Sequence, residues 1–207
     1  MVMTLTTHKL VLGVLGGIGS GKSAAASALA RHGGRVVAGD PAGHAALLDP
    51  AIHQRIAQRW PEAIDQTGNV DRKTLGRIVF ADAAQLRELE SFVFPWIKER
   101  LQREIVAAKA DPVVRYVILD AAVMLEADWA GVCDKLIFMD APRELRVARV
   151  AARGWTAEDL DRRERSQIAL DEKRRRADAV LRNVGDLVAL QCHADELLAR
   201  WGLPAES

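Results

Sequence analysis

Residues Gly16–Ser23 read GGIGSGKS and complete the pattern G-x-x-x-x-G-K-[ST], which decides the fold of this chain. The apolar run Leu10–Leu15 precedes this loop, and the alanine-rich segment Ala24–Arg31 that follows it has a helical pattern. A strand, a glycine-rich loop and a helix in this order leave backbone N–H groups free to surround a polyphosphate at the positive end of the helix dipole. In such a loop Lys22 can reach the β- and γ-phosphates and Ser23 can bind Mg²⁺. We therefore predict that the loop binds a nucleoside triphosphate, with a structural glycine-rich turn as the alternative.

The composition is that of an ordinary globular chain. Of 207 residues 49% are apolar and 28% are charged, and the formal net charge is +1, which predicts one well-cored domain with room for a small insertion. A balanced charge gives no general attraction to nucleic acid or to a membrane surface. Cys133 and Cys192 lie far apart in the sequence and are expected to be free thiols. Because Met1–Lys9 lacks the features of a secretion signal and no apolar run approaches the roughly 18 residues of a membrane span, we expect a cytoplasmic protein, either a monomer or a small homo-oligomer.

Short apolar runs alternate with helical patterns along the chain, which is typical of a parallel sheet covered on both faces. The expected strands are Leu10–Leu15, Arg35–Ala38, Tyr116–Leu119, Lys135–Met139 and Ala179–Leu181. The three later strands end in or are followed closely by a polar residue, namely Asp120, Asp140 and Asn183. Ligands of open α/β sheets bind at the carboxyl ends of strands, so these positions are candidates for a site.

The segment between the second and third expected strands, residues 41–112, is helical in pattern throughout. Its expected helices are Ala51–Trp60, Asp71–Phe80 and Ala83–Ala110, the last bent or broken near Pro95. Such a segment is too long for a crossover helix. We interpret it as a helical subdomain that binds a second substrate, with a purely structural role as the alternative. The nucleotide-binding core is then formed by residues 1–40, 113–142 and 177–207.

Residues 143–176 are rich in arginine and predict a lid. Arg149 and Arg153 are one helical turn apart and face the same way. Phosphoryl transfer calls for a lid whose arginines close over the phosphates of ATP. A solvated helical face is the alternative. After this segment, Leu187–Trp201 is expected to be an amphipathic helix that packs on the core.

A GTPase switch is one alternative function for the loop. Asp128–Gly131 matches D-x-x-G, and Asn183–Asp186 resembles N-K-x-D. However, Asp128 lies well past the strand that ends at Leu119, and Val184 stands where the guanine-binding lysine should be. We interpret both matches as chance.

A mechanical or nucleic-acid ATPase is a second alternative. That class expects an Asp-Glu pair after an apolar strand, but Ala121 follows Asp120, and the balanced charge provides no polynucleotide track. A small-molecule kinase explains the length, the helical insertion and the arginine-rich segment together.

Further motifs, in order along the chain, resemble the dephospho-coenzyme A kinase family. They are Val37–Asp40 with His44; Asp71–Leu75 with Val79 and Phe80; Pro95–Arg100; Glu126; the spacing of Arg149, Arg153, Arg163 and Gln167; and Lys173, Ala177-Asp178 and Asn183. The resemblance spans roughly residues 10–200. The chain departs from the family at Phe94-Pro95, where His-Pro is usual, at Ala122–Met124, where Pro-Leu-Leu is usual, and at Ala24, where threonine is common.

The resemblance implies a three-layer P-loop kinase fold and transfer of the γ-phosphoryl group of ATP to the ribose 3′-hydroxyl of dephospho-CoA, with Mg²⁺ as cofactor. The catalytic residues it implies are Asp40, as base, with Lys22, Arg149 and Arg153. The implied ATP-binding residues are Gly17, Ile18, Gly19, Ser20, Gly21, Lys22, Ser23, Ala24 and Asn183, and the implied metal ligands are Ser23 and Asp120. The implied acceptor-binding residues are Asp40, His44, Arg72, Phe94, Pro95, Arg100 and Glu126.

Several of these residues have simpler interpretations. Asp40 precedes Pro41 and is also a suitable helix N-cap, Asp120 is also a suitable cap for the next turn, and His44 is also a plausible surface residue. Arg72 and Arg100 are equally suited to surface salt bridges. A nucleoside or nucleotide monophosphate kinase, or a nucleotide-binding protein without activity, remains the alternative function.

Overall fold

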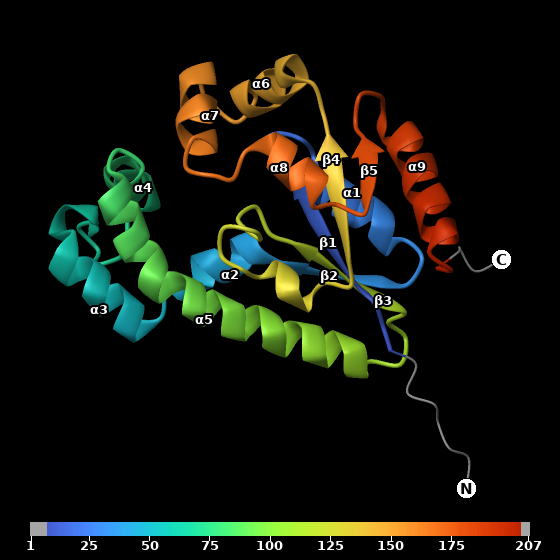
Figure 1. Cartoon of the computed structure of the whole chain (residues 1–207). Helices are drawn as coiled ribbons and strands as arrows, with labels where there is room; N and C mark the ends of the chain where they lie inside the picture. The colour runs from blue at the N-terminus through green and yellow to red at the C-terminus, as the bar shows by residue number, and fades with distance from the viewer. Residues whose placement is uncertain (1–7, 204–207) are drawn as a thin grey trace, which may run out of the picture.

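The computed structural model describes residues 8–203 and contains the expected five-stranded parallel sheet (Figure 1). The strand order is β2-β3-β1-β4-β5, and every neighbouring pair is parallel. The strands are β1 (Val11–Gly16), β2 (Gly34–Ala38), β3 (Tyr116–Asp120), β4 (Lys135–Asp140) and β5 (Ala179–Arg182). Each lies within a residue or so of the run predicted from the sequence, so the fold prediction is confirmed.

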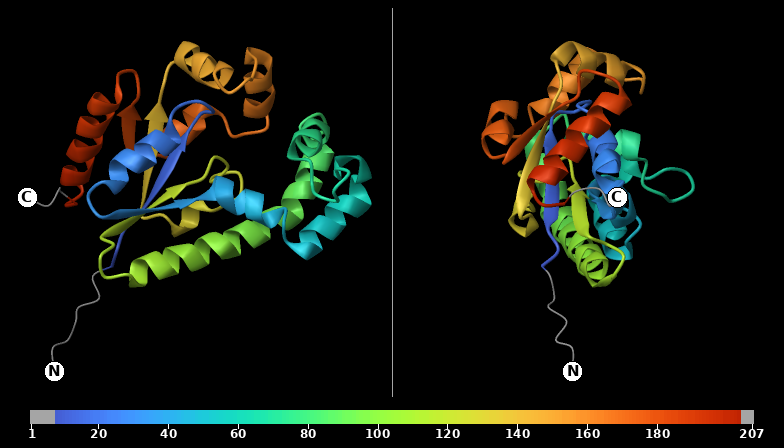
Figure 2. Two further views of the ribbon diagram at one scale, coloured as in Figure 1. Left: turned by 180° about the vertical axis from the view of Figure 1, so that it is seen from behind. Right: turned by 90° about the vertical axis from the view of Figure 1, so that its right-hand side faces the viewer.

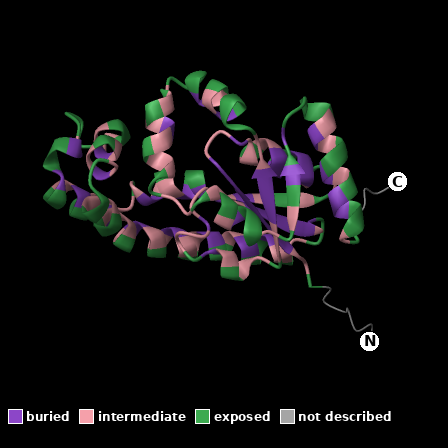
Figure 3. Cartoon of the chain, turned by 45° about the horizontal axis from the view of Figure 1, so that its top comes forward, coloured by how far each residue is buried: buried purple, intermediate pink, exposed green. Residues whose placement is uncertain are grey.

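Helices cover both faces of the sheet, so the hydrophobic core consists of two clusters, one on each face. On one face β1 contributes Leu12 and Val14 to a cluster with α1 (Lys22–Ala30) and α9 (Leu187–Arg200). On the other face β1 contributes Val11 and Leu15, which pack in a cluster with residues of α2 (Gly39–Ala46) and α5 (Ala83–Ala110). Because side chains alternate along a strand, a strand buried on both faces is apolar at every position. Figure 3 shows the buried strands between helices whose outer sides are exposed.

The helical insertion, residues 41–112, extends beyond one edge of the sheet (Figure 2). Its helices are the rest of α2, then α3 (Pro50–Arg59), the short 3-10 helix η1 (Pro61–Ala63), α4 (Arg72–Val79) and α5. An aspartate caps the start of three of them: Asp49 accepts from Ala51 N at 3.0 Å, Asp71 from Lys73 N at 3.0 Å and Asp82 from Ala84 N at 2.7 Å. The insertion has its own buried residues, such as Trp60, whose indole N–H donates to Gln85 Oε1 at 2.7 Å.

The long helix α5 joins this insertion to the sheet. It runs unbroken from Ala83 to Ala110 with Pro95 inside it, and Figure 1 shows that it bends along its length. Proline removes one backbone donor and bends a helix, so the expected disturbance takes the form of a bend.

The arginine-rich segment, residues 143–176, forms α6 (Arg143–Ala151), α7 (Ala157–Glu164) and α8 (Leu170–Arg175). Helices α6 and α7 lie beyond the carboxyl ends of the strands (Figure 1). Helix α8 packs against the body of the protein instead, because Leu170 joins the core and Lys173 is 1% exposed.

In the described part of the chain no helix is long and apolar enough to cross a membrane. Cys133 and Cys192 are both free thiols. Residues 1–7 and 204–207 lie outside the described residues. They include the outer ends of the predicted core and most of the segment Met1–Lys9.

Candidate active site

The loop between β1 and α1 depends on two glycines with left-handed backbone. Gly21, the N-cap of α1, has a φ of 92°, and a Cβ there would lie 2.1 Å from Asn183 Nδ2. Gly19 has a φ of 76°, and a Cβ there would lie 2.8 Å from the carbonyl oxygen of Arg146. Side chains are therefore excluded at both positions, which leaves room for a ligand to approach the backbone of the loop closely.

Asn183 and Arg149 hold this loop through hydrogen bonds to its carbonyl oxygens. Asn183, which is buried, donates from Nδ2 to the carbonyl oxygen of Ser20 at 2.8 Å. Arg149 donates to the carbonyl oxygens of Ser20 at 3.2 Å, Gly19 at 3.3 Å and Asn183 at 3.1 Å. Neither side chain lines the cavity described below. The structure thus places the predicted nucleotide contact and the predicted catalytic arginine in contacts that shape the loop.

A buried ion pair holds the other side of the loop. Arg146 on α6 pairs with Glu164 on α7, and Glu164 Oε1 also accepts from the backbone N–H of Ile18 at 3.3 Å. The arginine-rich segment is therefore bonded to the loop through its own buried charges, an arrangement that the sequence did not reveal.

Lys22, Ser23 and Asp120 meet at the carboxyl ends of β1 and β3. Ser23 Oγ donates to Asp120 Oδ2 at 2.8 Å, so the two predicted metal ligands are neighbours. Burial raises the pKa of Asp120, against the hydrogen bond from Ser23, which lowers it. Burial also lowers the pKa of Lys22 to about 8, against the attraction of Asp120. Lys22 Nζ donates to the carbonyl oxygens of Gly16 at 3.2 Å and Gly17 at 3.0 Å.

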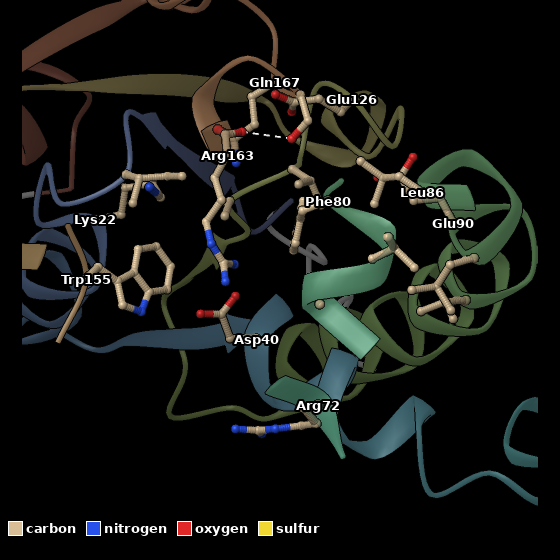
Figure 4. A pocket seen from close by; sticks show the side chains of 18 of the residues that line it. Lys22, Asp40, Arg72, Phe80, Leu86, Glu90, Glu126, Trp155, Arg163 and Gln167 are labelled. Atoms are coloured by element: carbon tan, nitrogen blue, oxygen red, sulfur yellow. Dashed lines mark hydrogen bonds between the residues drawn. The ribbon is translucent and has the colours of Figure 1, made fainter. Parts of the chain in front are cut away.

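A cavity of about 540 Å³ opens from the loop toward the helical insertion (Figure 4). Of the predicted residues it is lined by Ile18, Gly19, Gly21, Lys22, Ser23, Ala24, Asp40, Arg72, Phe94, Asp120, Glu126 and Arg153. Its far end is apolar, with Leu75, Val79, Leu86, Leu89 and Val93 from α4 and α5. One cavity thus joins a cationic, glycine-rich end to an apolar end on the insertion, which suits a ligand that has a polar and an apolar part.

Asp40 stands between these two ends. It lies in the first turn of α2, where Ala38 occupies the N-cap position, so the interpretation of Asp40 as an N-cap is wrong. Its carboxylate is exposed, and among residues 8–203 it has neither an ion pair nor a hydrogen bond from another group. The side chain is therefore free to accept a proton or a hydrogen bond from a ligand.

A second cavity of about 950 Å³ adjoins the first on the side of α2 and α4. Asp40 and Arg72 line both cavities, and His44 lines only the second. Arg72 and His44 are exposed, one from α4 and the other from α2. These three predicted acceptor residues therefore share one wall.

Three further predicted acceptor residues, Phe94, Pro95 and Arg100, lie on α5, and only Phe94 lines a cavity. Pro95 and Arg100 line neither cavity. Arg100 bonds Glu104 at 2.9 Å on the same helix, as the surface interpretation predicts. Phe94 does line the first cavity, and its ring packs edge-on against Trp129 with centroids 5.4 Å apart.

Glu126 lines the first cavity but is already engaged. Its Oε1 accepts from Lys173 Nζ at 2.8 Å and from the backbone N–H of Ile168 at 2.9 Å. Lys173 also donates to Gln167 Oε1 at 3.0 Å. This buried cluster ties the loop after β3 to α8, and the sequence spacing alone did not connect Glu126 with Lys173.

The cavities are also lined by residues that were not predicted as site residues, although three of them, Phe80, Arg163 and Gln167, belong to the motifs named above. Arg163 and Trp155 line both cavities, and Glu90, Phe80 and Gln167 line the first. The available signals were the motif that contains Phe80 and the spacing of Arg163 and Gln167, both of which resemble the kinase family; α7 ends at Glu164, so Gln167 lies beyond the helix that carries Arg163.

Known proteins resemble this chain over most of its length. The sequence profile of the dephospho-CoA kinase family matches residues 10–189. The dephospho-CoA kinase of Latilactobacillus sakei is 35% identical over 189 residues, covering 90% of this chain and 93% of that protein. The dephospho-CoA kinase of Thermus thermophilus is also 35% identical, and the match covers 93% of this chain and 92% of that protein.

The chain belongs to the dephospho-CoA kinase family.

Solved structures agree on the fold of this family member. A crystal structure of a Thermus thermophilus protein superposes with a TM-score of 0.77 at 35% identity, covering 94% of this chain and 98% of that one. A dephospho-CoA kinase from Campylobacter jejuni has a TM-score of 0.60 at 21% identity, and a shikimate kinase from Acinetobacter baumannii 0.52 at 13%, which support the fold alone. The chain is thus an enzyme of the kinase class, for which ATP is the phosphoryl donor, with a P-loop kinase fold.

Membership of this family also removes the GTPase interpretation, and the structure explains one of the chance matches. Asp186, the last residue of the N-K-x-D-like stretch, is the N-cap of α9 and accepts from Ala189 N at 2.8 Å. The Asp186 side chain therefore caps the start of α9.

Proposed function

We propose that this kinase transfers the γ-phosphoryl group of ATP to the ribose 3′-hydroxyl of dephospho-CoA, giving coenzyme A and ADP, the last step of coenzyme A synthesis. The observation that carries the proposal is the single cavity shared by Lys22, Ser23 and Asp40, which continues into an apolar end on α4 and α5. The donor would bind at the glycine-rich loop and the acceptor would enter from the insertion. The free thiols of Cys133 and Cys192 suit the reducing cytoplasm in which we place this reaction.

In the proposed reaction Asp40 acts on the acceptor hydroxyl. The hydroxyl oxygen forms a bond to the γ-phosphorus, the bond from that phosphorus to the β,γ-bridging oxygen breaks, and the proton passes to the Asp40 carboxylate. Because Asp40 has no partner of its own in the described structure, it can accept that proton without first losing an ion pair. ADP leaves with the bridging oxygen.

Cationic groups around the loop would stabilise the charge on the transferred group. Lys22 is half-buried beside the loop carbonyls, and Arg153, exposed after α6, lines the same cavity. In phosphoryl transfer the enzyme acts mainly by positioning and by charge neutralisation, and these two side chains would contribute positive charge directly. Arg149 would contribute indirectly, through the loop carbonyls that it bonds.

Ser23 and Asp120 are the residues that would hold Mg²⁺. A hydroxyl and a carboxylate joined at 2.8 Å form the donor set that P-loop enzymes offer this ion. Mg²⁺ usually keeps several water and phosphate ligands, so two protein ligands are enough for it. When bound, the ion neutralises charge on the β- and γ-phosphates.

The test is a coupled ADP-release assay with dephospho-CoA and, in parallel, nucleoside monophosphates as acceptors. We expect turnover with dephospho-CoA and a product phosphorylated at the 3′ position, identified by NMR. Asp40→Asn should lower kcat by about 10²-fold or more with little change in the KM for ATP. Asp171→Asn, an exposed carboxylate outside both cavities, is the matched control and should not change kcat.

Faster turnover with a nucleoside monophosphate would replace the proposed acceptor. ATP binding without any acceptor-stimulated turnover would leave only nucleotide binding. Near-normal turnover of Asp40→Asn would reject Asp40 as the base without affecting the choice of acceptor.

A further inference from the structure

Arg163 on α7 lies between two aromatic rings that come from different parts of the chain. Its guanidinium carbon is 4.0 Å from the ring centroid of Trp155 and 4.6 Å from that of Phe80. Trp155 lies between α6 and α7 in the arginine-rich segment, and Phe80 ends α4 in the helical insertion. Stacking on two rings fixes the plane of the guanidinium and attracts its charge.

No carboxylate forms an ion pair with this arginine in the part of the chain that the structure describes. Other arginines of the same segment do have carboxylate partners: Arg143 pairs with Asp161, Arg146 with Glu164 and Arg162 with Asp159. For Arg163 no ion pair and no side-chain hydrogen bond occurs among residues 8–203. Burial lowers the pKa of Arg163, against the attraction of Asp159, which raises it but forms no ion pair with Arg163. Its N–H donors remain available to an anion.

The position of Arg163 indicates which anion it would meet. Arg163 lines both cavities, together with Asp40 and Arg72, whereas residues of the glycine-rich loop line only the first. Figure 4 shows the side chain passing between Trp155 and Phe80 and pointing toward Asp40. The guanidinium therefore lies on the acceptor side of the proposed base, at the boundary of the two cavities.

We propose that Arg163 is a specificity-determining residue that binds the diphosphate group of the acceptor. This inference rests on the proposed function. When the 3′-hydroxyl lies at Asp40, the diphosphate on the 5′ position of the same ribose lies only a few bonds away, within reach of the same wall. A planar guanidinium bonds phosphate oxygens in pairs, and the two rings hold it ready for that geometry. Arg72, exposed on the same wall, supplies a second positive charge.

The test compares ligands with and without the diphosphate. For wild type, Arg163→Met and Arg163→Lys, the KM values of dephospho-CoA and ATP are measured, and adenosine is assayed as an inhibitor competing with dephospho-CoA. Arg163→Met should raise the KM of dephospho-CoA about 10- to 100-fold, because the variant loses hydrogen bonds between charged groups. The inhibition constant of adenosine and the KM of ATP should change less than about twofold, because neither ligand places a phosphate at this wall. Arg163→Lys keeps the charge without the planar guanidinium, so its KM for dephospho-CoA should lie between those of wild type and Arg163→Met.

The matched control is Arg165→Met, an exposed arginine at the end of the same helix that lines neither cavity, which should keep all three constants. Equal weakening of dephospho-CoA and adenosine would overturn the inference, because it would mean that Arg163 shapes the pocket as a whole. A rise in the KM of ATP alone would assign Arg163 to the donor phosphates. A wild-type enzyme that turns over dephospho-CoA, with Arg163→Met showing a normal KM, would reject this inference and leave the proposed function standing. No turnover of dephospho-CoA by wild type would reject the proposed function itself.

Discussion

Replacing Lys173 by methionine should strongly destabilise the protein. Lys173 is 1% exposed, and its ammonium group lies 2.8 Å from Glu126 Oε1 and 3.0 Å from Gln167 Oε1. Methionine is similar in length but carries no charge. The variant would leave the Glu126 carboxylate in place with its remaining bond from Ile168 N at 2.9 Å, while Glu126 Oε2 has no hydrogen-bond partner in the described structure.

The expected loss follows from leaving one charge of a buried pair uncompensated. Removing one partner of such a pair costs about 3–5 kcal/mol in the free energy of unfolding. For a domain of this size each kcal/mol lowers the Tm by about 2–4 °C, so the Tm should fall by about 6–20 °C. Adding Glu126→Gln should recover part of this loss, because an amide removes the unpaired charge and still accepts a hydrogen bond from Ile168 N.

The free energies are measured by urea denaturation and the Tm by calorimetry. Lys135→Met is the matched control: Lys135 pairs with Asp178 at 3.1 Å, but the two side chains are 41% and 38% exposed, so its loss should be about 0–1 kcal/mol. The prediction is wrong if Lys173→Met lowers the free energy of unfolding no more than Lys135→Met does. It is also wrong if the double variant Lys173→Met/Glu126→Gln loses the sum of the two single losses, since the two residues would then be uncoupled.

Two further predictions concern stability at high pH and the nucleotide loop. Tyr116, whose buried hydroxyl donates to the carbonyl oxygen of Leu29 at 2.6 Å, has its pKa raised by burial to about 12. Its contribution to stability should be complete below about pH 10, the pKa of an unfolded tyrosine, and be lost as the pH rises from about 10 to 12. Urea denaturation at several pH values should therefore show a smaller alkaline loss for Tyr116→Phe, and an equal loss in both proteins would contradict this. Gly21→Ala should weaken ATP binding at least about tenfold in calorimetry, because its left-handed backbone costs about 1–2 kcal/mol for alanine and a Cβ would displace Asn183. Gly131→Ala, with nothing within 4 Å of the added Cβ, should bind ATP normally.

Much of this protein follows from local sequence pattern. The five strands, the loop at Gly16–Ser23 and the helical nature of residues 41–112 were all predictable, because apolar periodicity, glycine conformation and helix caps act over a few neighbouring residues. Asp120 was also recognisable as a polar residue at the end of a strand, and Asp40 from the motif Val37–Asp40 after the second strand; both line the first cavity. The strand order was not predictable from any one of these runs, since the pattern of a strand does not show which strand lies beside it.

The roles of several site residues were decided only by contacts between distant segments. Arg149 and Arg153 look alike in the sequence, yet Arg149 bonds the loop carbonyls and Arg153 lines the cavity. Glu126 finds Lys173 from α8, and Arg163 finds Phe80 from α4, because the fold brings these elements together. Local pattern determined that the chain forms a P-loop core with a candidate base beside it, since backbone conformation and side-chain period are short-range properties. Whether a charged residue is paired in the interior or left free to meet a ligand depends on its neighbours in space, and that only the tertiary structure decided.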